Sequence, residues 1–211
     1  MPNFAMTPPP NSYAQAADQD HMWEYNDLHS QVVLSRLIER LRDLPQPIIS
    51  IINGPAVGAG LGLALVSDIR IGSSKSFFLV GFSNLGLSNC DVGTSYLLPR
   101  VVGQPKAAEM MLTGKGLDSS AALECGLLSQ LVDQKADMQR EAVRWAEKML
   151  KMSNWGLILT KKQMQVSMDC SNLHAAITAE NSHQMYLMNR PDVAEMAKQH
   201  VQHMGTGRSK L

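Results

Sequence analysis

The sequence predicts an α/β core over its first two thirds and an all-helical region at its end. Short apolar and β-branched runs at 47–52, 69–73 and 76–80 have the length and composition of strands. From residue 135 onward, apolar residues recur at helical spacing instead. At 211 residues and without an internal repeat, the chain is long enough for one domain with a substantial core.

Four segments are expected along the chain. Residues 1–20 contain three consecutive prolines and little apolar pattern, so they are read as an irregular segment. Residues 21–133 form the α/β core, and residues 134–204 form the helical region. Residues 205–211 are polar and glycine-rich, which is typical of a flexible tail.

The core is expected to begin with a helix over about 22–44, which Pro45 and Pro47 end. A strand over 47–52 follows and passes through a glycine-rich turn into the apolar run 61–66. The apolar residues of the first helix share one face: Leu34, Leu37, Ile38 and Leu41.

The second half of the core alternates loops with short helices. Residues 81–93 are rich in Gly, Asn and Ser and read as a loop, followed by a helix over 94–102 interrupted at Pro99. The next helix runs from Pro105 to residue 112, with proline in its first turn. Asp118 can cap a third helix that Gly126 ends, and residues 127–133 read as a last strand.

Two apolar stripes mark the helical region, and Pro191 separates the last two helices. The first stripe consists of Met138, Ala142, Trp145, Ala146 and Met149. The second consists of Leu173, Ala176, Ile177, Met185 and Met188.

Composition excludes several classes of function. The 19 basic and 19 acidic residues balance, so no net field favours nucleic acid or an anionic membrane. No apolar run has the length of a membrane span. Cys90, Cys125 and Cys170 form no CxxC pair, so neither a metal site nor a disulfide framework is expected. Three buried free thiols in a reducing compartment are expected instead.

The chain ends in Ser209, Lys210 and Leu211. A terminal S-K-L tripeptide is an import address that a peroxisomal receptor reads. The sequence therefore predicts a peroxisomal protein that binds the import receptor.

The turn around Gly58, Ala59 and Gly60 is the strongest candidate for a site. A helix that starts through small residues leaves its first N–H groups unpaired, and its dipole adds partial positive charge there. Such a turn suits a phosphate or a developing oxyanion. The alternative interpretation is a tight strand–helix connection without a ligand.

The stretch PQPIISIINGPAVGAGLGLALVSDIRIG resembles the signature of the crotonase superfamily, the enoyl-CoA hydratases and isomerases. The later stretches LGLSNCDVGTSYLLPRVVG, AAEMMLTGKGLD and AALECGLLSQLVD follow in that family's order. The resemblance implies a ββα spiral fold followed by C-terminal helices. It also implies an acyl-CoA substrate with no other cofactor, a role in fatty-acid β-oxidation, and a homotrimer or hexamer.

The resemblance also assigns roles at the turn. The N–H of Ala59 would hold the thioester carbonyl oxygen, with Gly58 and Gly60 leaving room for its approach. The family's other oxyanion donor lies upstream of where this chain begins. We therefore expect the N-terminal part of the spiral to be lacking, which could also prevent the chain from folding alone.

Two departures from the family bear on the chemistry. The two glutamates of the hydratases correspond to Gly62 and Phe82, neither of which can move a proton. Asp91 matches an acid/base aspartate of the dienoyl-CoA isomerase branch, whose other two carboxylates also correspond to Gly62 and Phe82, so a full isomerase site is not expected either. Two alternatives stay open: Asp91 could instead cap the helix that starts near Gly93, and the protein could bind acyl-CoA without catalysis.

Overall fold

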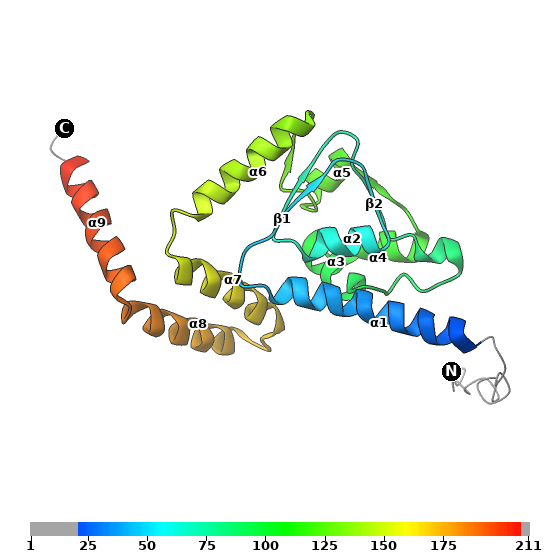
Figure 1. Cartoon of the computed structure of the whole chain (residues 1–211), viewed down its shortest axis with the longest axis horizontal. Coiled ribbons are helices and arrows are strands. Elements are labelled where there is room, and N and C mark those ends of the chain that lie inside the picture. Colours follow the sequence, from blue (N-terminus) through cyan, green and yellow to red (C-terminus); the bar gives the residue numbers. More distant parts are fainter. Residues whose placement is uncertain (1–20, 208–211) are drawn as a thin grey trace.

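The computed structural model describes residues 21–207, which form an α/β body with a helical arm extending from it (Figure 1). The body contains two small sheets and the helices packed on them. The expected mixed α/β architecture with a helical C-terminal region is confirmed. The segment 1–20 and the targeting residues 208–211 lie outside the described residues.

Helix α1 (His21–Asp43) opens the described chain and packs along α2 and the core cluster. Ile38 is buried, and Leu34 and Leu41 are partly buried against the core, which confirms that face of the expected helix. Leu37 lies at the margin of this face and is 44 % exposed.

The two sheets each contain three strands. In the first sheet, β3 (Ile69–Gly72) lies between β1 (Ile49–Ile52) and β6 (Gln130–Leu131), with all strands parallel. In the second sheet, β4 (Phe77–Leu79) pairs in parallel with β2 and antiparallel with β5. The short strands β2 (Pro55–Val57) and β5 (Leu117–Asp118) were not expected from the sequence. Strand β6 covers only two residues of the run predicted at 127–133.

Four helices complete the body: α2 (Ala59–Val66), α3 (Thr94–Val102), α4 (Gln104–Thr113) and α5 (Ser119–Glu124). Asp118 caps α5 by accepting the N–H of Ala121, as predicted. The expected interruption at Pro99 is wrong, because α3 continues to Val102. Proline removes a single helical donor here, close to the end of the helix. The largest fully buried side chains include Phe78, Leu61, Leu65, Ile71, Leu98, Met110 and Leu127.

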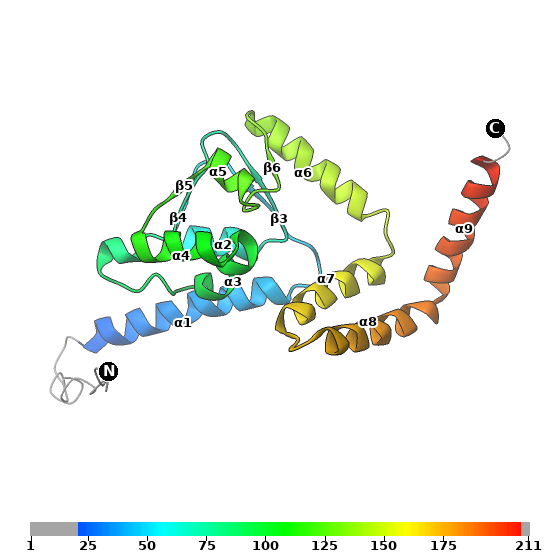
Figure 2. The same ribbon diagram turned by 180° about the vertical axis from the view of Figure 1, so that it is seen from behind.

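The C-terminal region consists of α6 (Lys135–Met149), α7 (Asn154–Asp169), α8 (Leu173–Met188) and α9 (Pro191–Gly207). Met138 of α6 is fully buried. Helices α7 and α8 pack together, and α8 and α9 extend away from the body in both views (Figures 1 and 2). Part of the second predicted apolar stripe is therefore exposed: Leu173, Ile177, Met185 and Met188.

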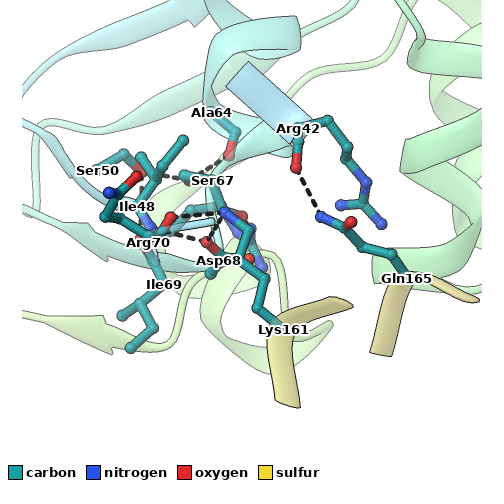
Figure 3. Close-up of polar contacts among 11 residues, drawn as sticks. Arg42, Ile48, Ser50, Ala64, Ser67, Asp68, Ile69, Arg70, Lys161 and Gln165 are labelled. Atoms are coloured by element: carbon teal, nitrogen blue, oxygen red, sulfur yellow. Dashed lines mark hydrogen bonds and ion pairs between the residues drawn. The ribbon is translucent and has the colours of Figure 1, made fainter. Parts of the chain in front are cut away.

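A buried polar cluster attaches α7 to the body (Figure 3). Lys161 is 6 % exposed, and its Nζ donates to the Asp68 carboxylate at 2.8 Å and to the Gln46 carbonyl at 2.9 Å. Asp68 also accepts the N–H of Ile48 at 2.7 Å. Burial lowers the pKa of the neighbouring Arg70 guanidinium, and the Asp68 charge opposes that shift. These contacts hold α7 beside the residues that precede β1 and β3, while α6 packs on the two strands themselves.

The expectation of three buried thiols is wrong. The cysteines are free, but Cys90 is exposed, and Cys125 and Cys170 are partly exposed. All three lie in loops or at helix ends, where neighbouring elements do not enclose them. Across residues 21–207, no helix is both long and apolar enough to cross a membrane. The same residues contain no cluster of three or more His, Cys, Asp or Glu side chains suited to a metal ion.

Candidate functional site

The glycine turn joins β2 to α2 and is held at both of its ends. The Gly58 N–H donates to the Leu79 carbonyl of β4 at 3.0 Å, and the Gly62 N–H closes the first helical turn on the Gly58 carbonyl at 3.1 Å. Gly58 has a φ of 56°, which β-carbon-bearing residues rarely adopt. A β-carbon at Gly58 would lie 3.4 Å from the ring of Phe82.

The first N–H groups of α2 have no acceptor in the part of the chain that the structure describes. These are the N–H groups of Ala59, Gly60 and Leu61. Ala59 and Gly60 are partly exposed, and a β-carbon built on Gly60 meets no atom within 4 Å. The first turn also contains no acidic residue to neutralise the helix dipole. Such an end can hold a ligand oxygen through main-chain donors.

The loop that contains Asp91 packs on α2 through its neighbour Val92. A β-carbon built on Gly62 would lie 2.8 Å from Cγ2 of Val92 and 3.1 Å from its carbonyl oxygen. Val92 is 3 % exposed and has a φ of 43°, which is unusual for a β-branched residue. The space beside Gly62 is therefore filled by Val92, and the loop that contains Asp91 packs on the first turns of α2.

One oxygen of the Asp91 carboxylate is anchored. Oδ1 accepts the N–H of Val92 at 2.7 Å and also accepts a hydrogen bond from the side-chain amide of Gln31 in α1. Oδ2 has no hydrogen-bond partner among the side chains and backbone that the structure describes. The side chain is partly exposed. This arrangement fixes the carboxylate and leaves one oxygen available to a ligand.

The interpretation of Asp91 as a helix cap is wrong. Helix α3 is capped by Gly93, which has a φ of 78° and no side-chain hydrogen bond. The Asp91 carboxylate instead binds the N–H of Val92, which precedes the helix. The backbone carbonyl of Asp91 accepts the N–H of Thr94, so its main chain supports the turn.

The loop before Asp91 is rigidly attached to the body. Asn89 is 7 % exposed and accepts the Ser83 N–H at 2.9 Å. Its amide donates to the Met111 carbonyl at 2.7 Å. The buried Thr94 hydroxyl donates to the Asn89 carbonyl at 2.9 Å. A loop fixed in this way holds the backbone of Asp91 in one place.

Of the predicted site residues, Gly58, Ala59 and Gly60 form the turn at the start of α2, and Asp91 lies in the loop whose next residue, Val92, packs on Gly62 of that helix. The targeting residues Ser209, Lys210 and Leu211 lie outside the described residues. Sequence reasoning missed Gln31, because no local pattern links it to a residue 60 positions away. It also missed the positive φ of Val92, which no turn-forming residue type marks.

A separate groove of about 460 Å³ lies between α7 and α8 and shares no lining residue with the glycine turn. Its lining includes Met164, Met168 and Leu187. The groove therefore does not form part of the candidate site.

Comparisons with known proteins agree with this fold. The profile of the family described as "Enoyl-CoA hydratase/isomerase" matches residues 5–204. The chain is 38 % identical to a probable enoyl-CoA hydratase of Mycobacterium tuberculosis, across 76 % of this chain and 56 % of that protein. It is 35 % identical to the 1,2-epoxyphenylacetyl-CoA isomerase of Escherichia coli, across 75 % of this chain and 60 % of the relative. The chain thus spans less than two thirds of the length of these relatives.

Solved structures give the same result. A probable enoyl-CoA hydratase/isomerase from Mycobacterium abscessus superposes with a TM-score of 0.79 at 34 % identity. That superposition covers 84 % of this chain and 67 % of the mycobacterial one. The protein therefore belongs to the enoyl-CoA hydratase/isomerase family.

Proposed function

We propose that the protein acts on acyl-CoA thioesters through the glycine turn and Asp91. The observation that carries this proposal is an anchored carboxylate whose neighbour Val92 packs on Gly62 of α2, the helix whose first main-chain donors are unpaired. The family supports a CoA thioester as the substrate.

The turn would stabilise charge on the substrate. The Ala59 N–H donates to the thioester carbonyl oxygen, and this hydrogen bond strengthens when the oxygen becomes enolate-like. Removing one donor from such a site costs about 2.7–4 kcal/mol of transition-state stabilisation. The dipole of α2 acts in the same direction, since the first turn contains no carboxylate.

Asp91 would move the proton. Its Oδ2 removes a proton from the carbon between the carbonyl and the double bond of a 3-enoyl thioester, which leaves a dienolate. The same carboxyl then returns that proton to the far end of the conjugated system, so the double bond shifts. One carboxyl group suffices and no water is consumed, which makes isomerisation the chemistry that fits this site.

Hydration fits less well. The positions of the two hydratase glutamates hold Gly62 and Phe82, and Val92 fills the space beside Gly62. An attacking water would have no second carboxylate there. The 1,2-epoxyphenylacetyl-CoA isomerase of Escherichia coli, a relative at 35 % identity, supports the isomerase alternative.

A second candidate is an acyl-CoA-binding protein without turnover, which the replacement of both glutamate positions by Gly62 and Phe82 favours. For either candidate we propose peroxisomal fatty-acid β-oxidation as the setting, on the basis of the terminal Ser209, Lys210 and Leu211. We also propose a homotrimer or hexamer by resemblance to the family.

The test uses the purified full chain with two substrates. Isomerisation of a 3-enoyl-CoA increases the absorbance of the conjugated thioester, whereas hydration of a 2-enoyl-CoA decreases it. We expect the first reaction, and we expect Asp91→Asn to slow it by about 10²–10⁴-fold. Thermal stabilisation by acyl-CoA without turnover would instead support the binding protein. If the protein shows neither turnover nor thermal stabilisation by acyl-CoA, both candidates are excluded.

A further inference from the structure

The carboxylate of Asp91 is oriented from two directions. The Val92 N–H belongs to the same loop as Asp91. The Gln31 amide comes from α1, 60 residues earlier in the chain. Both donors bind Oδ1. Neither they nor any other described group binds Oδ2, so the two oxygens have different surroundings.

The Val92 contact alone leaves the carboxylate free to turn. A single donor to one oxygen permits rotation about the bond to the carboxyl carbon, which would bring either oxygen to the substrate side. A second donor on the same oxygen restricts that rotation. We propose that Gln31 is a positioning residue that holds Oδ2 of Asp91 toward the acyl carbon. This inference rests on the proposed function.

The residue type at position 31 suits this role. A glutamine amide donates a hydrogen bond without bringing a formal charge, so it orients the carboxylate without forming an ion pair with it. Gln31 is exposed and makes no other hydrogen bond to the described residues, so its amide is committed to Asp91 in this structure. Since α1 packs on α2, the donor is carried by a helix in contact with the one that begins at the glycine turn.

Two variants of the full chain test the inference. Gln31→Met keeps the approximate length of the side chain and removes the donor. Gln31→Glu keeps the shape and places a second carboxylate against Asp91. We expect both to lower kcat by about tenfold or more with KM changed less than about twofold, because a misdirected group affects the reaction rather than binding. Glu39→Ala, on an exposed position of the same helix, is the matched control and should keep wild-type kinetics.

The decisive step is to repeat Gln31→Met in an Asp91→Asn background. If Gln31 acts through Asp91, its removal costs less than about twofold there, so the two effects do not add. Two results overturn the positioning role and leave the proposed function intact. In the first, Gln31→Met lowers kcat tenfold both in the wild type and in the Asp91→Asn variant. In the second, Gln31→Met has a wild-type kcat although Asp91→Asn is slow. Full activity of Asp91→Asn, or no turnover by the wild type, overturns the proposed catalysis and this role with it.

Discussion

At the scale of single residues, the glycines of the turn have different roles. Gly58 needs the freedom of glycine because its φ is 56° and the Phe82 ring lies close. Gly60 faces open space, where its small size leaves access to the first N–H groups of α2. Gly62 is small because Val92 occupies the volume that a side chain would need. Two of these glycines therefore serve the fold, and the third leaves the first N–H groups of α2 accessible.

Comparing the variants Gly58→Ala and Gly60→Ala distinguishes the role in backbone conformation from the role in access to the donors. Gly60→Ala should leave the melting temperature unchanged or slightly raised, since alanine favours a helix by about 1 kcal/mol over glycine. It should nevertheless weaken acyl-CoA binding or turnover, because the methyl group occupies the approach to the donors. Gly58→Ala should lower stability by about 1 kcal/mol or more through backbone strain. Melting curves with and without acyl-CoA measure both, and equal effects of the two variants would contradict this division.

At the scale of elements, charged side chains of the helices form contacts of two different kinds. Helix α7 reaches the body through Lys161, whose ammonium is almost completely buried against Asp68 and the Gln46 carbonyl. Within α4, Glu109 pairs with Lys106 one turn earlier and with Lys115 beyond the end of that helix. The first contact is enclosed and the second is open to solvent, so they should contribute very differently to stability.

Removing the buried partner should destabilise the protein. Lys161→Met leaves Asp68 with its Ile48 hydrogen bond but without its counter-charge, and breaking such pairs costs about 3 kcal/mol. The double variant Lys161→Met with Asp68→Asn should be more stable than the single one, because the Asp68 carboxylate is no longer left without the Lys161 charge. Urea unfolding measures both. A single variant as stable as the wild type would show that this contact does not hold α7.

The contact of Glu109 with Lys106 and Lys115 at the surface should make the stability of the protein depend only weakly on pH. The hydrogen bond and charge of Lys106, with those of Lys115, lower the pKa of Glu109 from 4.5 to about 2. A carboxyl with a lowered pKa in the folded state contributes stability above its unfolded pKa and loses it as the pH falls toward 2. The melting difference between wild type and Glu109→Gln should therefore shrink between pH 5 and pH 2, as well as in high salt. A difference that persists at pH 2 would contradict this origin.

At the scale of the whole molecule, local patterns predicted the body well. The glycine turn, the Asp118 cap and the helix that begins near Pro105 all follow from residue types at fixed local positions. Strand β2 was missed because its three residues lie between turn-forming glycines and pair with β4 only in the folded chain. Exposure of the last apolar stripe could not be predicted either, since spacing gives a helical face but not what covers it.

The site was predicted in part. Sequence placed Gly58, Ala59 and Gly60 at a helix start, and the structure has them there. The cap role of Asp91 was wrong because Gly93 adopts the left-handed conformation that starts α3. The contact between Gln31 and Asp91 joins residues 60 positions apart, and only the packing of α1 on the body brings them together.

The most direct test removes the main-chain donor of Ala59. Ala59 is the first residue of α2, a position that tolerates proline, so Ala59→Pro deletes the N–H while keeping the helix. Ala59→Gly retains the N–H and serves as the control. We predict that Ala59→Pro melts within a few degrees of wild type, with kcat on an enoyl-CoA reduced by about 10²–10³-fold, and that Ala59→Gly stays close to wild type. A folded Ala59→Pro protein with wild-type turnover would contradict the account.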